Sequence, residues 1–380
     1  MAVALVGGRV LNGQGFVSGL GVVIDAGRIV SVTSEAEALA NGDQRYDLGG
    51  GRLAPGFVDT QVNGGGGVLF NDDMSVEAIA AIGEAHRRFG TTGFMPTLIS
   101  EDLGAIERAL RAVEAAIAAG VPGVLGVHVE GPFLNAARAG IHDKKKFRVL
   151  DEKARTLLSS LKAGRTLVTL APERTEPGMI RALAHAGVVV AAGHTDASYE
   201  QIRAALEAGV SGFTHLFNAM SPLASRAPGA VGAALEDQAS YCGIIVDGRH
   251  IHPAVLRIAL RSKPLDRFML VTDAMPSVGM KEKAFTLQGQ RITVQDGVCV
   301  APDGTLAGSD LDMARAVRNA TALLDVEPVE ALRMASLNPA RFLGVDHLMG
   351  RIAPGLRADL VLLDDAAEVV ATWIGGERAV

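Results

Sequence analysis

The sequence is poor in cysteine, in aromatic residues and in positive charge. Its two cysteines, Cys242 and Cys299, lie far apart and outside any CxxC pair. They cannot form the disulfide framework of a small secreted protein, so we expect a reducing, cytoplasmic compartment. Lysine and arginine number 36 against 42 acidic residues, which gives a formal net charge of −6. This balance argues against a nucleic-acid-binding protein, which needs a basic face to neutralise phosphates.

Long apolar runs are also missing. No uninterrupted run reaches the roughly 18 residues that a membrane-spanning helix requires. The N-terminal stretch MAVALVGG lacks the basic start and the long apolar core of a secretory signal. What the chain does have is 48% hydrophobic residues and 45 glycines, with 21% charged residues. We therefore expect no membrane partner and a well-buried α/β enzyme, long enough for one large domain and one small domain.

Both ends of the chain have the pattern of short strands. The N-terminal part contains AVALVGGRVL and GVVIDAGRIVSVT, separated by glycine-rich turns, and the C-terminal part contains ADLVLLDD and VVATWIGG. We predict one small β-sandwich domain built from both termini, residues 1–53 and 349–380. The catalytic domain is then the segment inserted between them, residues 54–348.

The middle of the chain alternates compact apolar runs with segments of helical period. There are eight such runs, namely GRLAPGFVDT, TTGFMPTLI, GVLGVHVEG, TLVTLAPE, GVVVAAGHT, GFTHLFN, YCGIIVDG and FMLVTDA. Helix-like stretches such as 75–89 and 102–119 lie between them. The alternation indicates an α/β protein with a parallel sheet, and eight strands predict a (β/α)8 TIM barrel. A doubly wound open sheet would show the same periodicity.

Polar residues at the ends of these runs favour the barrel, in which functional residues lie on the loops after the strands. Glu130 follows the third run, His194 the fifth, His215 the sixth and Asp273 the eighth. Taken alone, each would more often be a structural hydrogen-bonding residue. Together, two imidazoles and a carboxylate are the ligands of a catalytic divalent ion, which activates water. A carboxylate at Asp273 could take a proton from that water and deliver it to a departing amine.

Sequence motifs around these residues resemble the amidohydrolase superfamily and, within it, the N-acetylglucosamine-6-phosphate deacetylase family. HVEGPF, THLFNAM and LAGS are quite specific to that family, whereas the last matching motif is shared across the superfamily. The matches run through essentially the whole chain: APGFVDTQVNG (54–64), HVEGPFLN (128–135), GIHD (140–143), AGHT (192–195), THLFNAMSP (214–222), DGRHIHP (247–253), VTDAM (271–275), LAGS (306–309) and GRIAPGLRADLV (350–361).

The resemblance implies a single metal ion. Many members of the superfamily bind a second metal through His-x-His after the first strand, but here Gln61 and Asn63 hold those positions. Neutral amides are poor ligands for a transition metal. The resemblance thus implies one divalent ion per subunit, held by Glu130, His194 and His215. Zn²⁺ is the expected ion, and Fe²⁺ or Co²⁺ would suit the same ligands. An inactive enzyme is the alternative, against which the retained ligands argue.

The same resemblance assigns the remaining site residues. Asp273 would be the catalytic acid and base, and His142 would hydrogen-bond the acetyl carbonyl and stabilise the oxyanion. Arg226 would bind the phosphate in the neighbouring subunit, since its fork of donors matches phosphate oxygens. That role implies a homodimer or a homotetramer. The other implied substrate contacts are Ile141, Asn218, Ala219, Asp247, His250, Leu306, Ala307 and Gly308.

The implied reaction is hydrolysis of N-acetyl-D-glucosamine 6-phosphate to D-glucosamine 6-phosphate and acetate. One alternative is N-acetylgalactosamine 6-phosphate, because the residues that read the sugar hydroxyls cannot be identified from the sequence. Cyclic amides are disfavoured, since enzymes acting on them usually hold two metals. The alternative from another class is a non-catalytic sensor of a sugar phosphate. A sensor would keep Arg226 and His250 and could lose the metal ligands.

Overall fold

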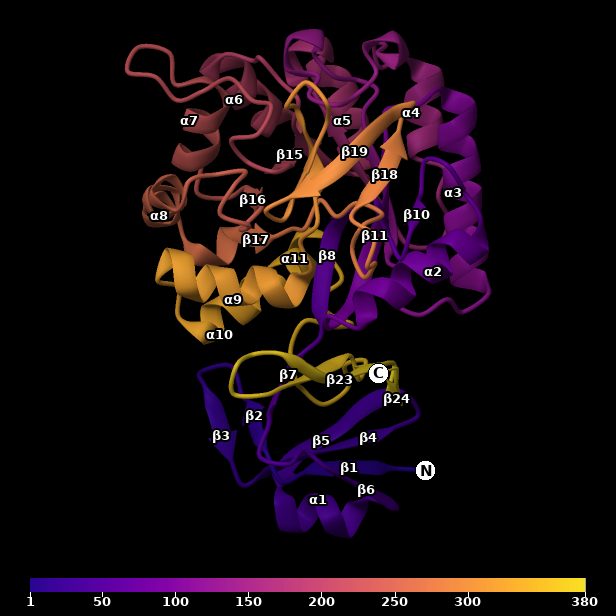
Figure 1. Cartoon of the computed structure of the whole chain (residues 1–380), viewed down its shortest axis with the longest axis vertical. Coiled ribbons are helices and arrows are strands. Elements are labelled where there is room, and N and C mark those ends of the chain that lie inside the picture. The colour runs from indigo at the N-terminus through magenta and orange to yellow at the C-terminus, as the bar shows by residue number, and fades with distance from the viewer. Residues whose placement is uncertain (380) are drawn as a thin grey trace.

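The structure, a computed structural model, describes residues 1–379 and contains two bodies (Figure 1). The larger body is a barrel of parallel strands with helices around it. The smaller body, below it in the figure, consists of sheets and one short helix. Strands from both ends of the chain lie in the smaller body, so the barrel is an insertion between them.

Eight parallel strands follow one another around the barrel in sequence order. Beyond β17 the ring is closed onto β8, because Val62 bridges Ala274 and the amide of Asp273 donates to the carbonyl of Gln61 at 3.0 Å. The predicted (β/α)8 barrel is confirmed, and this closure excludes the open sheet. The strands are β8 (Phe57–Val62), β11 (Thr91–Ile99), β12 (Gly126–Glu130), β13 (Arg165–Leu170), β14 (Val189–Ala192), β15 (Val210–Phe213), β16 (Tyr241–Ile244) and β17 (Phe268–Leu270).

Helices cover the outside of the barrel. Several begin at a residue whose side chain accepts the amide three residues on, as Ser75, Asp102 and Ser198 do. Their inward faces are apolar, and Ile79 and Ile82 are fully buried. Among residues 1–379, no helix is both long and apolar enough to cross a bilayer. The helices are α2 (Val76–Arg87), α3 (Leu103–Ala118), α4 (Glu152–Leu158), α5 (Pro177–His185), α6 (Tyr199–Ala208), α7 (Gly229–Glu236), α8 (Pro253–Ser262), α9 (Met313–Leu324), α10 (Pro328–Ala335) and α11 (Leu337–Phe342).

The N-terminal end of the barrel is filled by apolar side chains. Val58, Met95, Leu167 and Met269, from four different strands, pack with Phe342 at the end of α11. The polar residues that follow the strands lie at the opposite end. Packing at one end therefore stabilises the barrel and leaves the other end for a site.

The smaller body is a sandwich of two sheets, with strand orders β5-β4-β1-β6 and β24-β23-β22-β7-β2-β3. Leu5 and Val22 of the first sheet pack against Leu53 and Trp373 of the second. β22 pairs with β7, so both chain ends build this body, as predicted. The limits between 53 and 54 and between 348 and 349 stay predictions, and the first falls inside β7. The elements are β1 (Val3–Val6), β2 (Arg9–Leu11), β3 (Phe16–Ser18), β4 (Leu20–Asp25), β5 (Arg28–Ser34), α1 (Glu35–Asn41), β6 (Gln44–Asp47), β7 (Arg52–Pro55), β22 (Leu360–Leu363), β23 (Val369–Ile374) and β24 (Glu377–Arg378).

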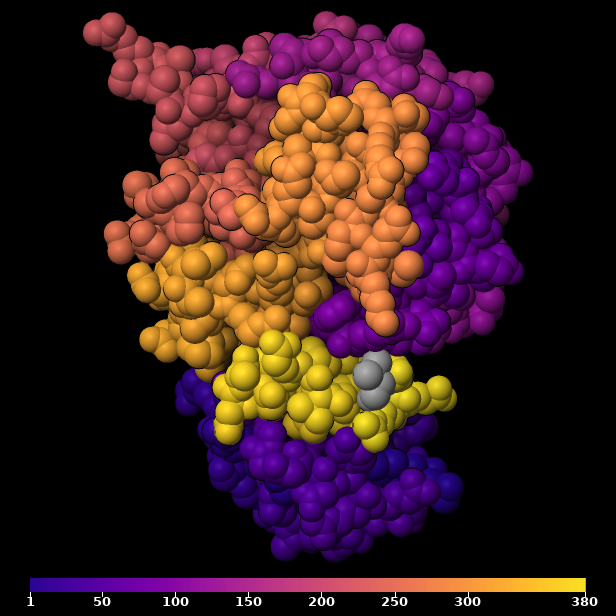
Figure 2. Space-filling model, in the orientation of Figure 1, coloured from indigo at the N-terminus to yellow at the C-terminus, as the bar shows by residue number. Residues whose placement is uncertain are grey.

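A further antiparallel sheet, which the sequence analysis did not predict, is inserted after β17. It appears in orange in front of the barrel, and the space-filling view shows it as one compact mass (Figures 1 and 2). Leu287, Ile292 and Cys299 are buried in its small core. Ala274 bridges Ser309, so this sheet is joined to the end of the last barrel strand. Its strands are β18 (Ala284–Leu287), β19 (Gln290–Gln295), β20 (Val298–Val300) and β21 (Leu306–Ser309), and a separate hairpin follows β8, with β9 (Gly64–Gly65) and β10 (Val68–Leu69).

Candidate metal centre and active site

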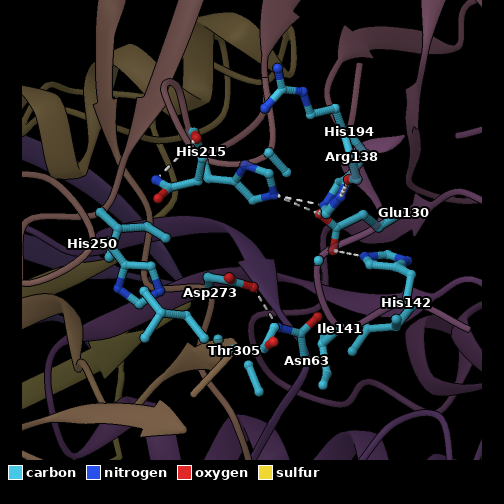
Figure 3. Close-up of a pocket in the computed structure, with 18 of the residues that line it drawn as sticks. Asn63, Glu130, Arg138, Ile141, His142, His194, His215, His250, Asp273 and Thr305 are labelled. Atoms are coloured by element: carbon cyan, nitrogen blue, oxygen red, sulfur yellow. Dashed lines mark hydrogen bonds and ion pairs between the residues drawn. The ribbon is translucent and has the colours of Figure 1, made fainter. Parts of the chain in front are cut away.

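A cavity of about 330 Å³ opens where the barrel strands run into their loops. Its volume is in the range of small-molecule sites. Figure 3 shows Glu130, His194 and His215 turned toward one another, with His142 and Asp273 facing the same space. Of the residues that the sequence analysis singled out, the cavity is lined by Asn63, Glu130, Ile141, His142, His194, His215, Asn218, Ala219, His250, Asp273, Leu306, Ala307 and Gly308.

Three buried side chains converge on one point of this cavity. Glu130 is the last residue of β12, while His194 follows β14 and His215 follows β15. Their ligand atoms all lie within 4.8 Å of one another. Nε2 of His215 is 3.0 Å from Oε1 of Glu130 and 3.0 Å from Nε2 of His194. Two imidazole nitrogens and a carboxylate oxygen at this spacing could hold a metal ion.

The hydrogen bonding of the cluster fits a cation. Nδ1 of His194 donates to the backbone carbonyl of Arg138 at 2.9 Å. Nε2 of the neutral His194 ring therefore carries a lone pair, which faces Nε2 of His215 and the carboxylate of Glu130. Acceptors this close repel one another unless a proton or a metal ion lies between them. A carbonyl that fixes the outer nitrogen of a ring is also the usual support of a metal-binding histidine.

The pKa shifts within the cluster point the same way. Burial disfavours a charged ring at His215, but the hydrogen bond and the charge of Glu130 outweigh it and raise the pKa of His215. Burial likewise opposes the charge of Glu130, whose pKa is nevertheless lowered well below its usual value by the neighbouring imidazole groups of His194 and His215. Both shifts favour positive charge beside the carboxylate of Glu130, and a bound metal ion would supply that charge.

The backbone at the strand ends is strained in the same way at three positions. His194, His215 and Asp273 have φ angles of 48°, 33° and 52°, in the left-handed region that residues other than glycine rarely adopt. Each such residue costs on the order of 1–3 kcal/mol and persists only where the surrounding structure enforces it. Here the bend after each strand directs the side chain into the cavity.

The two amides that stand in the His-x-His positions both donate to Asp273, and that of Gln61 also bridges to Glu130. Nδ2 of Asn63 donates to Oδ1 of Asp273 at 2.7 Å, and Nε2 of Gln61 donates to the same oxygen at 3.1 Å. Gln61 also donates to Oε1 of Glu130 at 3.1 Å. Burial and the nearby charge of Glu130 raise the pKa of Asp273 to about 6. At the positions where many superfamily members have metal-binding histidines, these two amides therefore present hydrogen-bond donors.

His142 lies on the loop after β12 and faces the same cluster. Its ring centroid is 4.3 Å from that of His194, and its Nε2 is 3.9 Å from Oε2 of Glu130. Burial, followed by the neighbouring ring of His194, lowers the pKa of His142 to about 3. The ring is therefore neutral at pH 7 and lies beside the three candidate ligands.

Three of the predicted residues do not line the cavity. Arg226 is exposed on the loop between β15 and α7, which projects from the molecule at the upper left of Figure 2. Asp247 lies behind His250, because its Oδ2 is 2.5 Å from Nδ1 of His250 and its Oδ1 accepts the amides of Arg249 and His250. Gln61 lies behind Asp273. The structure therefore gives Asp247 a supporting position rather than a place at the cavity wall.

Sequence reasoning missed Arg138, which lines the cavity, and Ser100, which lies beside the cavity. Arg138 carries the one permanent positive charge among the lining residues, all of which belong to the described part of the chain, and its Nε donates to Asp196 at 2.9 Å. Ser100 follows β11 and contacts His142 at 2.7 Å. The position of Ser100 directly after the second barrel strand was a usable signal. Arg138 follows the HVEGPFLN motif by three residues, and nothing else in the sequence marks it.

The cluster predicts which side chains metal binding depends on. His194→Ala should reduce the bound divalent metal to a small fraction of the wild-type content, because it removes one of three candidate ligands. His142→Gln is the matched control, since it changes a buried histidine of the same cavity that lies outside the cluster. Elemental analysis after dialysis gives both values. Equal metal content in the two variants would contradict the assignment of the ligands.

Comparison with known proteins agrees with this geometry. The amidohydrolase family model matches residues 52–379. An N-acetylgalactosamine-6-phosphate deacetylase of Shewanella sp. (strain ANA-3) is 42% identical over 98% of this chain and 94% of that protein. An N-acetylglucosamine-6-phosphate deacetylase of Haemophilus influenzae is 34% identical over 94% of this chain and 93% of that protein. The crystal structure of N-acetylglucosamine-6-phosphate deacetylase from Pasteurella multocida has a TM-score of 0.95 at 33% identity and covers 100% of this chain and 99% of that chain. The predicted resemblance is confirmed, and the chain belongs to the amidohydrolase family.

Proposed function

We propose that this chain hydrolyses the acetamide of N-acetyl-D-glucosamine 6-phosphate, releasing acetate and D-glucosamine 6-phosphate. The observation that carries the proposal is the buried Glu130–His194–His215 cluster with Asp273 facing it, in a member of a hydrolase family. Relatives 34% to 42% identical along nearly the whole chain bear the names of amino-sugar-phosphate deacetylases. The enzyme is therefore a hydrolytic deacetylase whose substrate is a small amino-sugar phosphate.

Glu130, His194 and His215 would hold one divalent ion, and Zn²⁺, Fe²⁺ or Co²⁺ would suit these ligands. When bound, such an ion lowers the pKa of water toward about 7 and polarises a carbonyl oxygen. Gln61 and Asn63 occupy the second position as donors to Asp273, which is why we propose one ion rather than two.

Asp273 is proposed to move the proton of the reaction. Its Oδ1 accepts both amide groups, which fixes the orientation of the carboxylate toward the cluster. With a pKa raised to about 6, the group can accept a proton from water and return it to the departing amine near neutral pH. His142 would donate a hydrogen bond to the acetyl carbonyl as negative charge develops on its oxygen.

The phosphate end of the substrate is proposed to lie against His250, Asn218 and Ala219. Leu306 and Gly308 of β21 would border the sugar, where the positive φ of 70° at Gly308 requires a glycine. Arg226 projects away from its own cavity, so we propose that it serves the site of a second copy in a homodimer or homotetramer. Two buried free thiols suit a reducing cytoplasm.

Replacing Asp273 separates metal binding from the catalytic step. Asp273→Asn should keep about one zinc ion per chain and lose about 10²- to 10⁴-fold in kcat, the usual contribution of a general acid–base group. Acetate release from N-acetyl-D-glucosamine 6-phosphate is the readout. Asp325→Asn is the control, because Asp325 lies in the left-handed region that asparagine tolerates, at the end of α9. Substantial retained turnover in Asp273→Asn would contradict the proposal.

N-acetylgalactosamine 6-phosphate is the second candidate substrate, because the Shewanella relative at 42% identity is named as a deacetylase of that sugar phosphate. Comparing kcat/KM for the two sugar phosphates decides between them. We expect the larger value for the glucosamine derivative, and a larger value for the galactosamine derivative would reassign the substrate. Binding of either sugar phosphate without acetate release would favour a sensor.

The subunit-crossing role of Arg226 is tested by complementation. Arg226→Ala should lower kcat/KM by about 10- to 100-fold, the value of charge-assisted hydrogen bonds. Mixing it with Asp273→Asn, under conditions that exchange subunits, should restore activity in about a quarter of the sites, because random pairing gives each mixed dimer one intact site. If Arg226 acts within its own chain, mixing restores nothing.

A further inference from the structure

Ser100 is a buried hydroxyl next to the candidate site. It directly follows β11, is 1% exposed, and its Oγ lies 2.7 Å from Nδ1 of His142. The hydroxyl can also donate to the backbone carbonyl of Glu130, but that contact, at 3.4 Å, is much longer than the contact with His142. A buried hydroxyl this close to a ring nitrogen determines how the ring can be protonated and oriented.

The surroundings of the ring indicate which nitrogen carries the hydrogen. Nε2 of His142 faces Oε2 of Glu130 at 3.9 Å, and Figure 3 shows the ring directed toward that carboxylate. A carboxylate favours a hydrogen on the nitrogen that faces it. In a neutral ring Nδ1 then carries a lone pair, which needs a hydrogen-bond donor. The aromatic rings packed against His142 are those of His194 and Phe147, and the polar group that contacts Nδ1 is the hydroxyl of Ser100, which is therefore that donor.

Ser100 and His142 differ in how firmly the fold holds them. Ser100 stands at the end of a barrel strand, and its hydroxyl occupies space that Gly131 leaves open, since a Cβ on Gly131 would lie 2.3 Å from Oγ. His142 lies on the loop between β12 and α4. Its backbone amide bonds within that loop, to Ala139. The Ser100–His142 contact therefore joins a loop residue to the rigid barrel.

We propose that Ser100 is a positioning residue, whose hydroxyl donates to Nδ1 of His142 and so holds a hydrogen on Nε2, directed at the acetyl carbonyl of the substrate. The proposal rests on the deacetylase function proposed above. A neutral histidine stabilises an oxyanion only through an N–H, so the other tautomer would present a lone pair to the developing charge. Loss of the correct tautomer lowers turnover more than it lowers binding.

Variants at Ser100 separate this role from a packing role. Ser100→Ala should lower kcat by about 10- to 100-fold, as losses of supporting hydrogen bonds do, with KM and zinc content nearly unchanged. Ser100→Thr keeps the hydroxyl and should recover most of the activity. Ser336→Ala is the matched control, because it removes an equally buried serine hydroxyl, near the packed end of the barrel. In the His142→Asn background, adding Ser100→Ala should cost less than about twofold. An equal loss in both backgrounds would overturn the proposal.

A spectroscopic test needs no variant at Ser100. Histidine ¹⁵N spectra of the zinc-loaded chain distinguish the two tautomers, and His142→Asn identifies the signals of His142. We expect the Nε2–H form in the wild type, and the Nδ1–H form would overturn the proposal. Failure of the proposed function is distinguishable, because the wild type would then release no acetate from either sugar phosphate whatever tautomer His142 shows.

Discussion

Three side-chain atoms that can each bind a metal ion meet inside this barrel with no room to separate. Oε1 of Glu130 and the Nε2 atoms of His194 and His215 lie about 3 Å apart, and all three side chains are buried. Close acceptors in a medium of low dielectric repel strongly unless positive charge lies among them. The strained backbone at the two histidines, the carbonyl that fixes His194 and the amides that brace Asp273 all serve to hold this arrangement.

The barrel supplies the rigidity that such an arrangement requires. Parallel strands all end at the same rim, so residues far apart in the sequence arrive within a few ångströms of one another. Apolar packing fills the opposite end, and the β-sandwich lies beyond that end, away from the cavity (Figure 1). The sheet β18–β21 instead brings Leu306 and Gly308 to the cavity wall. The proposed chemistry is thus concentrated at the rim, and the loops beyond it form the wall that would contact the substrate.

Much of the fold and the centre of the site could be predicted from the sequence, because strand-end polar residues and apolar runs follow directly from barrel geometry. Glu130, His194, His215 and Asp273 were placed together on that basis. The contacts of Ser100 could not be predicted, because they depend on where the loop that carries His142 folds back. Asp247 shares its motif with His250, yet its carboxylate turns behind that ring to meet two backbone amides. The strands after β17 are short and only partly buried, so their pattern was too weak to assign.

The account depends on one ion completing the cluster, and a titration tests this most directly. The full chain, stripped of metal, is supplied with Zn²⁺ in steps while acetate release from N-acetyl-D-glucosamine 6-phosphate is measured. The account predicts no turnover at the start and a linear rise that reaches its plateau at one equivalent per chain. Full turnover without metal, or a plateau that requires two equivalents, would contradict it.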